Sequence, residues 1–376
     1  MRKITAALTA LAVVFLLCLP AQAVGVQAHS AVLMDAGSGR VLYARDAHHP
    51  RLIASTTKLL TALVAAERTA DLDGTVTVKG EWLGSEGSSI DLRAGEEITL
   101  RGLLYGLLLQ SGNDAAMAIA CHIAGSEEAF VALMNQKAAE LGMKNSSFAN
   151  PSGLNDDNHY STAYDLALLA RACLDNETVA EICATRAVTV GTRTFINHNK
   201  LLSRYEGCVG MKTGFTEKAG RTLVSAAVRD GQTLICVTLN DPDDWNDHMK
   251  LLDYGFDTFP RQVLCRAGEV YGWVPVEGSL IPAVAVAARE ELGWPLTEAE
   301  EPVMEIELLQ SASAPLAPGV QLGELRWRLD GEVIAQMPLI SQSGAGLDAR
   351  EPLTLWEKAR TLFGGCVTFS QEKKKQ

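Results

Sequence analysis

The sequence lacks several features that would place it in a specialised class of protein. Lysine and arginine are outnumbered by aspartate and glutamate, 33 to 45, and the net charge of −12 argues against nucleic acid as the main partner. No Cys-x-x-Cys pair indicates a metal or redox site, and no solenoid repeat is visible. Beyond the N-terminus, no apolar run is long enough to span a bilayer. What remains is an ordinary globular composition, 47% hydrophobic and 21% charged, with enough residues for two domains.

The N-terminus carries a short apolar run with the pattern of a secretory signal peptide. Arg2 and Lys3 precede apolar residues 4–19, and Ala21-Gln22-Ala23 offers a small-residue cleavage site. The run ends at Pro20 and is shorter than the roughly 20 residues of a transmembrane anchor. We therefore expect residues 1–23 to be a signal peptide and the mature protein to be exported.

The cysteines do not form an obvious disulfide framework. Of eight, Cys18 leaves with the signal peptide, and an odd number of cysteines cannot all pair within one chain. Most lie in apolar surroundings, as small buried hydrophobic residues do. A bond between Cys173 and Cys183 stays open.

A first candidate for chemistry is Ser55-Thr56-Thr57-Lys58, which lies between an apolar approach and an apolar helical run. Residues three apart share a helix face, so Lys58 can bring its amine to the Ser55 hydroxyl. A serine needs such a base to become a nucleophile, and burial lowers the pKa of a lysine enough for it to act as one. The alternative is a plain helix N-cap at Ser55. A second Ser-x-x-Lys, at Ser370 and Lys373, lies in a polar tail.

Two further motifs follow along the chain. Ser111-Gly112-Asn113 interrupts an otherwise apolar helical stretch over residues 100–124, which predicts a turn that projects polar groups. We expect Ser111 to pass a proton to a leaving amine and Asn113 to hold a substrate amide. Taken alone, the same residues are typical of an ordinary turn between helices.

The third motif, Lys212-Thr213-Gly214, precedes two predicted apolar strands. Lys212 and Thr213 suit a substrate that ends in a free carboxylate, and Gly214 lets a strand approach the substrate backbone closely. Acyl transfer also needs two N–H groups aimed at the developing oxyanion, for which the backbones of Ser55 and Phe215 are candidates.

The composition of the chain changes beyond Pro260, which predicts two domains. We expect a catalytic domain over residues 28–262 and a small β-sandwich or barrel over residues 263–342, where Asp330-Gly331 predicts a hairpin. In the first domain, the patterns predict strands at 31–35, 40–43, 187–190, 192–196, 221–228 and 232–239, and helices at 127–141, 162–174 and 244–256. Residues 350–376 carry apolar side chains at helical spacing and then three lysines, which predicts an amphipathic helix on a membrane surface. The alternative is a helix packed on the β domain.

The three motifs in this order closely resemble the signature of penicillin-binding proteins and class A β-lactamases, in which the second motif is Ser-Asp-Asn. With Asn150-Pro151-Ser152-Gly153-Leu154 and residues 159–162 and 199–202, the chain resembles the low-molecular-mass penicillin-binding proteins, the serine-type D-alanyl-D-alanine carboxypeptidases. The resemblance implies an α/β catalytic domain, in which helices flank an antiparallel sheet and a helical subdomain carries Ser111, and an all-β C-terminal domain. It also implies hydrolysis of the terminal D-Ala of peptidoglycan pentapeptides, acylation by β-lactams, and no cofactor or metal. The enzyme would act at the outer face of the cytoplasmic membrane or in the cell wall.

Two rival functions share this fold. A class A β-lactamase adds a glutamate near residues 144–154, and that stretch contains none. A catalytically silent wall-binding homologue would lack residues that are present here. The sequence differs from common relatives at Phe215, where histidine is frequent, and at Val209-Gly210-Met211, which bears on substrate preference. Whether the substrate is vegetative wall or spore cortex stays open, as does endopeptidase action.

Overall fold

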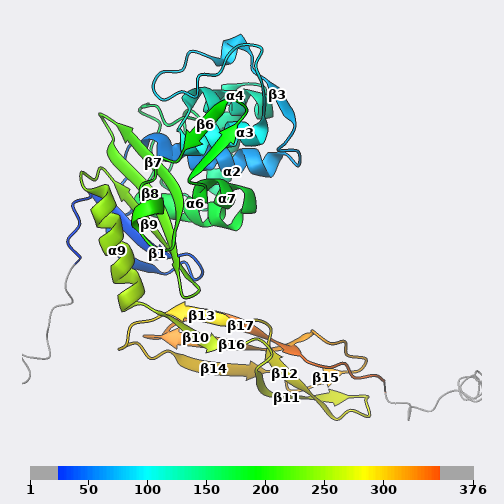
Figure 1. Ribbon diagram of the computed structural model, residues 1–376. Coiled ribbons are helices and arrows are strands. Elements are labelled where there is room, and N and C mark those ends of the chain that lie inside the picture. The colour runs from blue at the N-terminus through cyan, green and yellow to red at the C-terminus, as the bar shows by residue number, and fades with distance from the viewer. Residues whose placement is uncertain (1–23, 348–376) are drawn as a thin grey trace, which may run out of the picture. The chain divides into compact units, whose positions relative to one another are not determined.

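The computed structural model describes residues 24–347, which divide after Pro260 into two compact units (Figure 1). The expected signal peptide, residues 1–23, and the expected tail helix, residues 350–376, lie outside the described residues. The fold class predicted from sequence is confirmed, because the first unit combines an antiparallel sheet with flanking helices and the described part of the second, residues 261–347, is all β.

A five-stranded antiparallel sheet forms the centre of the first unit. Its strands, in the order β2-β1-β9-β8-β7, are β1 (Ser30–Asp35), β2 (Val41–Arg45), β7 (Cys208–Thr216), β8 (Gly220–Arg229) and β9 (Gln232–Leu239). Alternate residues of a strand point to opposite sides of the sheet. Here the residues on both sides are buried, each side in its own hydrophobic core. On β1, Val32 and Met34 join one hydrophobic core, while Ala31 and Leu33 join the other. β7 is an edge strand, so one of its two sides pairs with no other strand of this sheet.

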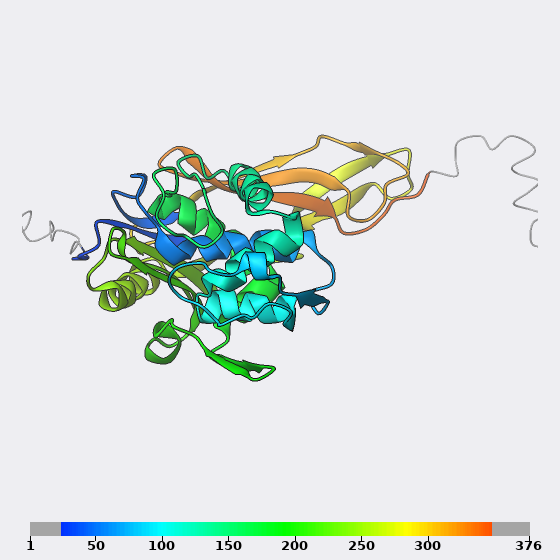
Figure 2. The same cartoon turned by 90° about the horizontal axis from the view of Figure 1, so that it is seen from above.

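Helices cover the two faces of this sheet (Figures 1 and 2). α9 (Asp244–Thr258) packs on one face through Leu251, Leu252 and Phe256. α2 (Lys58–Arg68) and α6 (Ala163–Asp175) lie against the other. Residues 58–65 of α2 are all buried, since α3 (Leu100–Leu109), α4 (Asn113–Ala124), α5 (Glu127–Glu140) and α7 (Glu177–Ala184) pack around it. This helix therefore holds the first motif rigidly.

Short elements complete the first unit: the 3-10 turns η1 (Ala54–Thr57) and η2 (Gly80–Trp82), the strand pairs β3 (Thr75–Thr77) with β4 (Glu97–Thr99) and β5 (Ala187–Val190) with β6 (Arg193–Ile196), and α8 (Leu201–Arg204). One local interpretation of the sequence is wrong. Ser55 is not a helix N-cap: it lies inside η1, and α2 begins at Lys58 without a side-chain cap.

Between residues 261 and 347, the second unit contains eight strands. β10 (Arg261–Cys265) pairs with β13 (Leu292–Pro295), and a six-stranded sheet has the order β14-β16-β17-β12-β11-β15. Those six strands are β11 (Val270–Glu277), β12 (Ala283–Ala288), β14 (Val303–Leu308), β15 (Ala312–Ser313), β16 (Gln321–Leu329) and β17 (Glu332–Ser341). The predicted hairpin joins β16 to β17, and Asp330 and Gly331 both take the positive φ that such a tight turn requires.

The six cysteines among residues 24–347 are free thiols. Cys173 and Cys183 are both buried, and the bond that the sequence left open between them is not formed. Burial raises the pKa of the Cys173 thiol well above its ordinary value, which keeps it protonated and unreactive.

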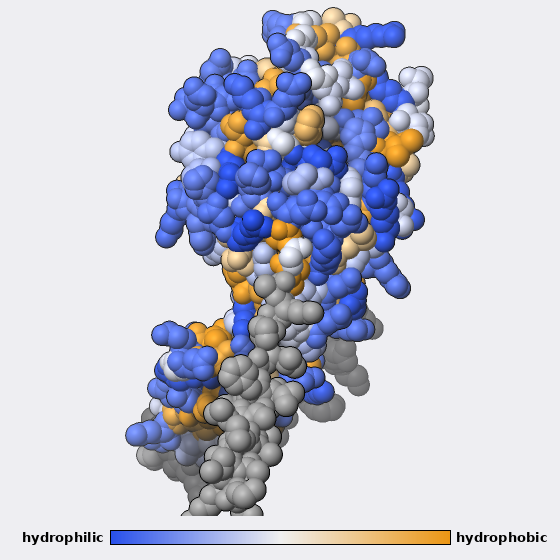
Figure 3. All heavy atoms as spheres, turned by 90° about the vertical axis from the view of Figure 1, so that its left-hand side faces the viewer, coloured by the Kyte–Doolittle hydropathy of each residue, from blue (hydrophilic) through white to orange (hydrophobic). Residues whose placement is uncertain are grey.

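Within residues 24–347, no single helix is long and apolar enough to cross a membrane. α4 and α5 together reach the required length and composition, but the chain bends by 87° between them. The face of the first unit in Figure 3 is largely hydrophilic, with hydrophobic residues in scattered patches, as expected for a unit whose apolar residues fill its interior.

Candidate active site

The nucleophile candidate Ser55 lies in the tight turn η1, which is fastened to the sheet. Thr222 Oγ1 on β8 donates to the Ile53 carbonyl at 3.0 Å. Ala54 has a φ of +48°, a strained value for a residue with a side chain, and such strain is typical of functional sites. Lys58 follows one turn later, and its Nζ lies 3.0 Å from Ser55 Oγ. The pairing predicted from sequence is thus present, although the local backbone is a 3-10 turn.

Lys58 is fully buried and makes three polar contacts. Besides Ser55, its Nζ contacts Asn113 Oδ1 at 2.7 Å and the Ser152 carbonyl at 2.5 Å. Burial lowers the pKa of Lys58 well below its ordinary value, and the nearby charge of Lys212 lowers it further. In the neutral amine, both N–H bonds point to the oxygens of Asn113 and Ser152. The lone pair then faces the Ser55 hydroxyl, which is the geometry of a general base.

The loop Asn150-Pro151-Ser152-Gly153-Leu154 sets the position of the Ser152 carbonyl. Asn150 Oδ1 accepts from three backbone N–H groups of the loop, those of Ser152, Gly153 and Leu154, at 3.2, 2.7 and 3.2 Å. Gly153 has a φ of +88°, and a Cβ there would lie 2.0 Å from the Ala54 carbonyl oxygen. Only glycine lets this loop lie directly against η1.

A buried histidine, His159, holds η1 in place through hydrogen bonds. His159 Nδ1 accepts from the Ala149 N–H at 3.1 Å, so the proton is on Nε2, which donates to Thr57 Oγ1 at 2.7 Å. The Thr57 hydroxyl in turn donates to the Ala54 carbonyl at 2.8 Å. Burial lowers the pKa of His159 to about 4, so the ring is neutral at neutral pH. His159 is a positioning residue, because it reaches Ser55 only through Thr57 and Ala54.

The second motif lies opposite Ser55. Ser111 has a φ of +62°, another strained value, and Asn113 is the first residue of α4. The Asn113 amide is already engaged within the protein: its Oδ1 accepts from Lys58 and its Nδ2 donates to the Glu86 carbonyl. Next to it, the buried Asp114 accepts from the N–H groups of Ile90 and Leu92. These bonds hold residues 86–92 beside the motif.

The third motif lies on the edge strand β7. Lys212 is buried, with 1% of its surface exposed, and its Nζ donates to the Thr213 carbonyl at 2.9 Å. Burial lowers the pKa of Lys212 to about 8. Gly214 lies where β7 meets η1: a Cβ there would be 2.4 Å from Thr222 Oγ1 and 2.9 Å from the Ser55 nitrogen. The close approach of strand and nucleophile therefore requires glycine at this position.

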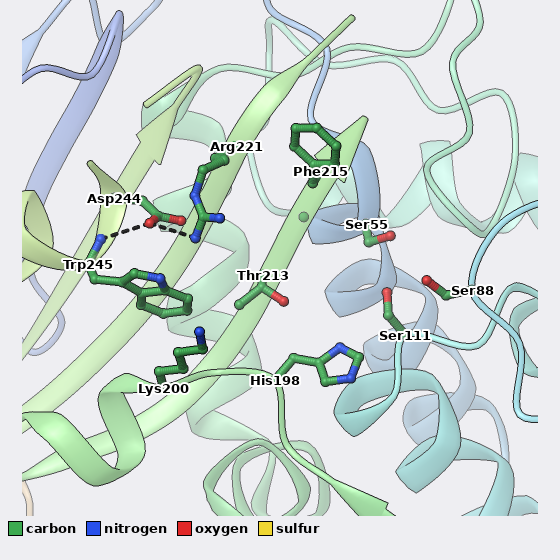
Figure 4. Close-up of a pocket in the computed structure, with 11 residues that line it drawn as sticks. Ser55, Ser88, Ser111, His198, Lys200, Thr213, Phe215, Arg221, Asp244 and Trp245 are labelled. Carbon is green, nitrogen blue, oxygen red and sulfur yellow. Dashed lines mark hydrogen bonds and ion pairs between the residues drawn. The ribbon is translucent and has the colours of Figure 1, made fainter. Parts of the chain in front are cut away.

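These elements surround a cleft of about 310 Å³ (Figure 4). Its lining comes from several separate segments of the first unit and consists of Ser55, Ser88, Ser111, His198, Lys200, Thr213, Gly214, Phe215, Arg221, Asp244 and Trp245. The structure thus brings five sequence-predicted residues to the cleft wall. The other three, Lys58, Asn113 and Lys212, are buried, and Lys58 and Asn113 lie directly behind Ser55. Within residues 24–347, no three histidine, cysteine, aspartate or glutamate side chains are placed to hold a metal ion.

Several lining residues were not found from the sequence. Arg221 is one residue into β8 and lies directly across from Phe215, so the strand register could have suggested it. Asp244 and Trp245 begin α9, after the chain has passed along β9, and no local pattern connects them to the cleft.

Comparison with known proteins agrees with this geometry. Residues 19–243 match the family model described as D-alanyl-D-alanine carboxypeptidase, peptidase S11. The chain is 34% identical to D-alanyl-D-alanine carboxypeptidase DacF of Bacillus subtilis, over 84% of this chain and 85% of that protein. It is 32% identical to DacC of Escherichia coli, over 85% and 84%.

Solved structures give the same answer for the fold. Penicillin-binding protein 5 of Haemophilus influenzae matches with a TM-score of 0.73 at 29% identity, covering 86% of this chain and 98% of that one. A peptidoglycan synthesis regulatory factor, PBP3 of Streptococcus pneumoniae, matches with a TM-score of 0.76 at 28% identity, covering 85% and 100%. The chain belongs to the D-alanyl-D-alanine carboxypeptidase family of serine peptidases.

Proposed function

We propose that this protein removes the terminal D-Ala from peptidoglycan stem peptides that end in D-Ala-D-Ala, by way of an acyl-enzyme on Ser55. The observation that carries the proposal is the arrangement at Lys58. Its amine is buried, its pKa is lowered, and Asn113 and Ser152 take its N–H bonds so that the lone pair faces Ser55 Oγ. That combination serves a proton acceptor next to a nucleophile and is hard to explain as stabilisation of the fold.

In the first half of the reaction, Ser55 Oγ attacks the carbonyl carbon of the penultimate D-Ala and Lys58 takes its proton. The backbone N–H groups of Ser55 and Phe215 stabilise the oxyanion. The hydroxyl of Ser111, which lines the same cleft, passes a proton from Lys58 to the departing amine, so that Lys58 returns to the neutral amine. The C–N bond breaks and D-Ala leaves.

In the second half, water attacks the ester, Lys58 accepts the proton of the water, and Ser55 is released with its hydrogen. Lys212 and Thr213 favour a substrate that ends in a carboxylate: Thr213 lines the cleft, and Lys212 supplies positive charge from behind it. β-Lactams would acylate Ser55 in the same way.

Hydrolysis of β-lactams as the main activity is the less supported alternative. Residues 144–154 contain no glutamate that could activate a deacylating water, and the loop there instead turns the Ser152 carbonyl toward Lys58. The β-lactam adduct should therefore persist.

The test is release of D-Ala from a synthetic pentapeptide ending in D-Ala-D-Ala, measured with wild type and with Ser55→Ala. We expect turnover by the wild type, none by the variant, and a much slower reaction with the same peptide amidated at its C-terminus. No release by a folded wild-type protein that also fails to bind penicillin would contradict the proposed function.

The location of the enzyme is part of the proposal. Residues 1–23 direct export, and residues 350–376 attach the protein to the outer face of the cytoplasmic membrane as an amphipathic helix. Deleting residues 350–376 should move the protein from the membrane fraction to the soluble fraction while penicillin binding survives. If the truncated protein still sediments with membranes, the tail is not the anchor.

A further inference from the structure

One end of the cleft carries a charged cluster that the reaction steps above do not use. Arg221, Lys200 and Asp244 line the wall together with Trp245, and Figure 4 shows Thr213 between this cluster and the two serines, Ser55 and Ser111. Asp244 is the one acidic side chain of the lining, and its own side chain is only 4% exposed. The accessible charge at this end is therefore positive.

Arg221 is held in a fixed orientation. One of its terminal nitrogens donates to Asp244 Oδ1 at 2.8 Å, and its guanidinium lies 5.6 Å from the centre of the Trp245 ring. Asp244 is itself fixed, because the same Oδ1 accepts from the Trp245 N–H at 2.9 Å. With 42% of the Arg221 side chain exposed, the remaining guanidinium N–H groups are accessible from the cleft.

An ion pair to α9 does not by itself indicate a binding role. At the other end of β8, Arg229 makes a similar set of contacts, with Asp253 of α9 at 3.3 Å and with the ring of Phe256 at 4.5 Å. Its partner is 54% exposed, and Arg229 does not line the cleft. What distinguishes Arg221 is a buried partner and a guanidinium that faces the same cleft as Ser55.

The substrate supplies a matching group. The carboxylate of its last residue is only one residue beyond the carbonyl that Ser55 attacks, so its anchor must line the same cleft. Lys212 does not line that cleft, because it is buried and its Nζ donates to the Thr213 carbonyl. A guanidinium binds a carboxylate through two parallel hydrogen bonds, and its planar fork loses little freedom when already oriented.

We propose that Arg221, oriented by Asp244 and Trp245, forms the direct ion pair with the C-terminal carboxylate of the substrate and so makes the enzyme a carboxypeptidase rather than an endopeptidase. This inference rests on the proposed function and names the residue that recognises the C-terminal carboxylate of the substrate. Asp244 is a positioning residue, and Thr213 provides a further hydrogen bond to the carboxylate.

The experiment compares Arg221→Leu with the matched control Arg229→Leu on the same strand. Each is assayed on one pentapeptide in two forms, with a free C-terminal carboxylate and with a C-terminal amide. Arg221→Leu should lower kcat/KM for the free acid by about 10- to 100-fold, the loss expected for a charged hydrogen bond, and leave the slow reaction of the amide unchanged. Arg229→Leu should change neither. Arg221→Lys, which keeps a charge for Asp244, should recover part of the loss.

The outcomes separate the inference from the function. An equal loss on both peptides in Arg221→Leu and Arg221→Lys would make Arg221 a structural residue and overturn the inference. No loss on either peptide would overturn it as well, because another group would then hold the carboxylate. If the wild type releases no D-Ala at all, the proposed function fails first.

Discussion

Burial gives the two lysines of the site different chemistry. Lys58 is buried beside another cation, which favours the neutral amine that a base requires, whereas burial lowers the pKa of Lys212 only to about 8. Lys212 is therefore mainly protonated at neutral pH and contributes positive charge beside Lys58. The same charge helps to keep Lys58 neutral, so Lys212 supports the role of Lys58 as a base.

This assignment predicts an alkaline limit to catalysis. As pH rises through about 8, Lys212 loses its proton and the site loses positive charge, so kcat/KM for a peptide with a free carboxylate should fall. Lys212→Arg keeps its charge to higher pH, so the fall in kcat/KM should begin at a higher pH, although the absolute rate of the variant will be lower. Peptide hydrolysis followed from pH 6 to about pH 10 provides the measurement. If kcat/KM falls at the same pH in both proteins, Lys212 is not the group whose deprotonation causes the fall.

His159 predicts a dependence of stability on acid. Its folded pKa, about 4, is below the ordinary value of 6.5, so the unfolded chain binds the proton more readily and stability falls as pH drops from about 6.5 toward 4. Between pH 7 and pH 5 the loss from this residue should be roughly 2 kcal/mol. Urea unfolding of wild type and His159→Gln at both values measures it, and the variant should lose less stability on acidification. His248, whose pKa burial lowers to about 3, contributes equally in both proteins. Identical losses would show that His159 is not the titrating group.

At the scale of elements, the site depends on three backbones that meet without side chains between them. η1, the loop around Gly153 and the edge strand β7 approach one another where Gly153 and Gly214 lie. An added Cβ at Gly153 would contact the Ala54 carbonyl oxygen at 2.0 Å, and one at Gly214 would contact the Ser55 nitrogen at 2.9 Å.

Gly153→Ala tests this close packing. Gly231, in the turn between β8 and β9, also has a positive φ, but a Cβ there meets nothing within 4 Å. Gly231→Ala should therefore cost only about 1 kcal/mol of unfolding free energy, the penalty of the backbone conformation. Gly153→Ala should cost more and should also slow acylation by a β-lactam, since it displaces the turn that carries Ser55. Equal destabilisation with normal acylation would contradict the packing described here.

The sequence predicts these elements well where a pattern is local. The apolar runs of β8 and β9, the break between α3 and α4, and the three motifs were all recognisable, because each is set by neighbouring residues. The start of α2 was misjudged, since the Ser55 hydroxyl contacts Lys58 and not a backbone N–H. The roles of Ser152 and His159 depend on contacts between residues 94 and 102 positions apart, which no local pattern encodes.

At the scale of the whole molecule, every residue of the site belongs to the first unit. The division after Pro260 leaves the sheet, both of its cores and the entire cleft on one side. Residues 24–260 produced alone should fold and bind a fluorescent penicillin, with a thermal unfolding transition like that of the full chain. Unfolded protein, or folded protein without labelling, would show that the second unit is needed for the site.

The central claim, that Ser55 is the nucleophile and Lys58 its base, is tested most directly by mass spectrometry after incubation with benzylpenicillin. The account predicts one adduct of the intact mass of the drug, located on the peptide that contains Ser55. Ser55→Ala should carry no adduct, and Lys58→Ala should acylate about 10²- to 10⁴-fold more slowly while remaining folded. An adduct on any other residue, or acylation of Lys58→Ala at the wild-type rate, would contradict the account.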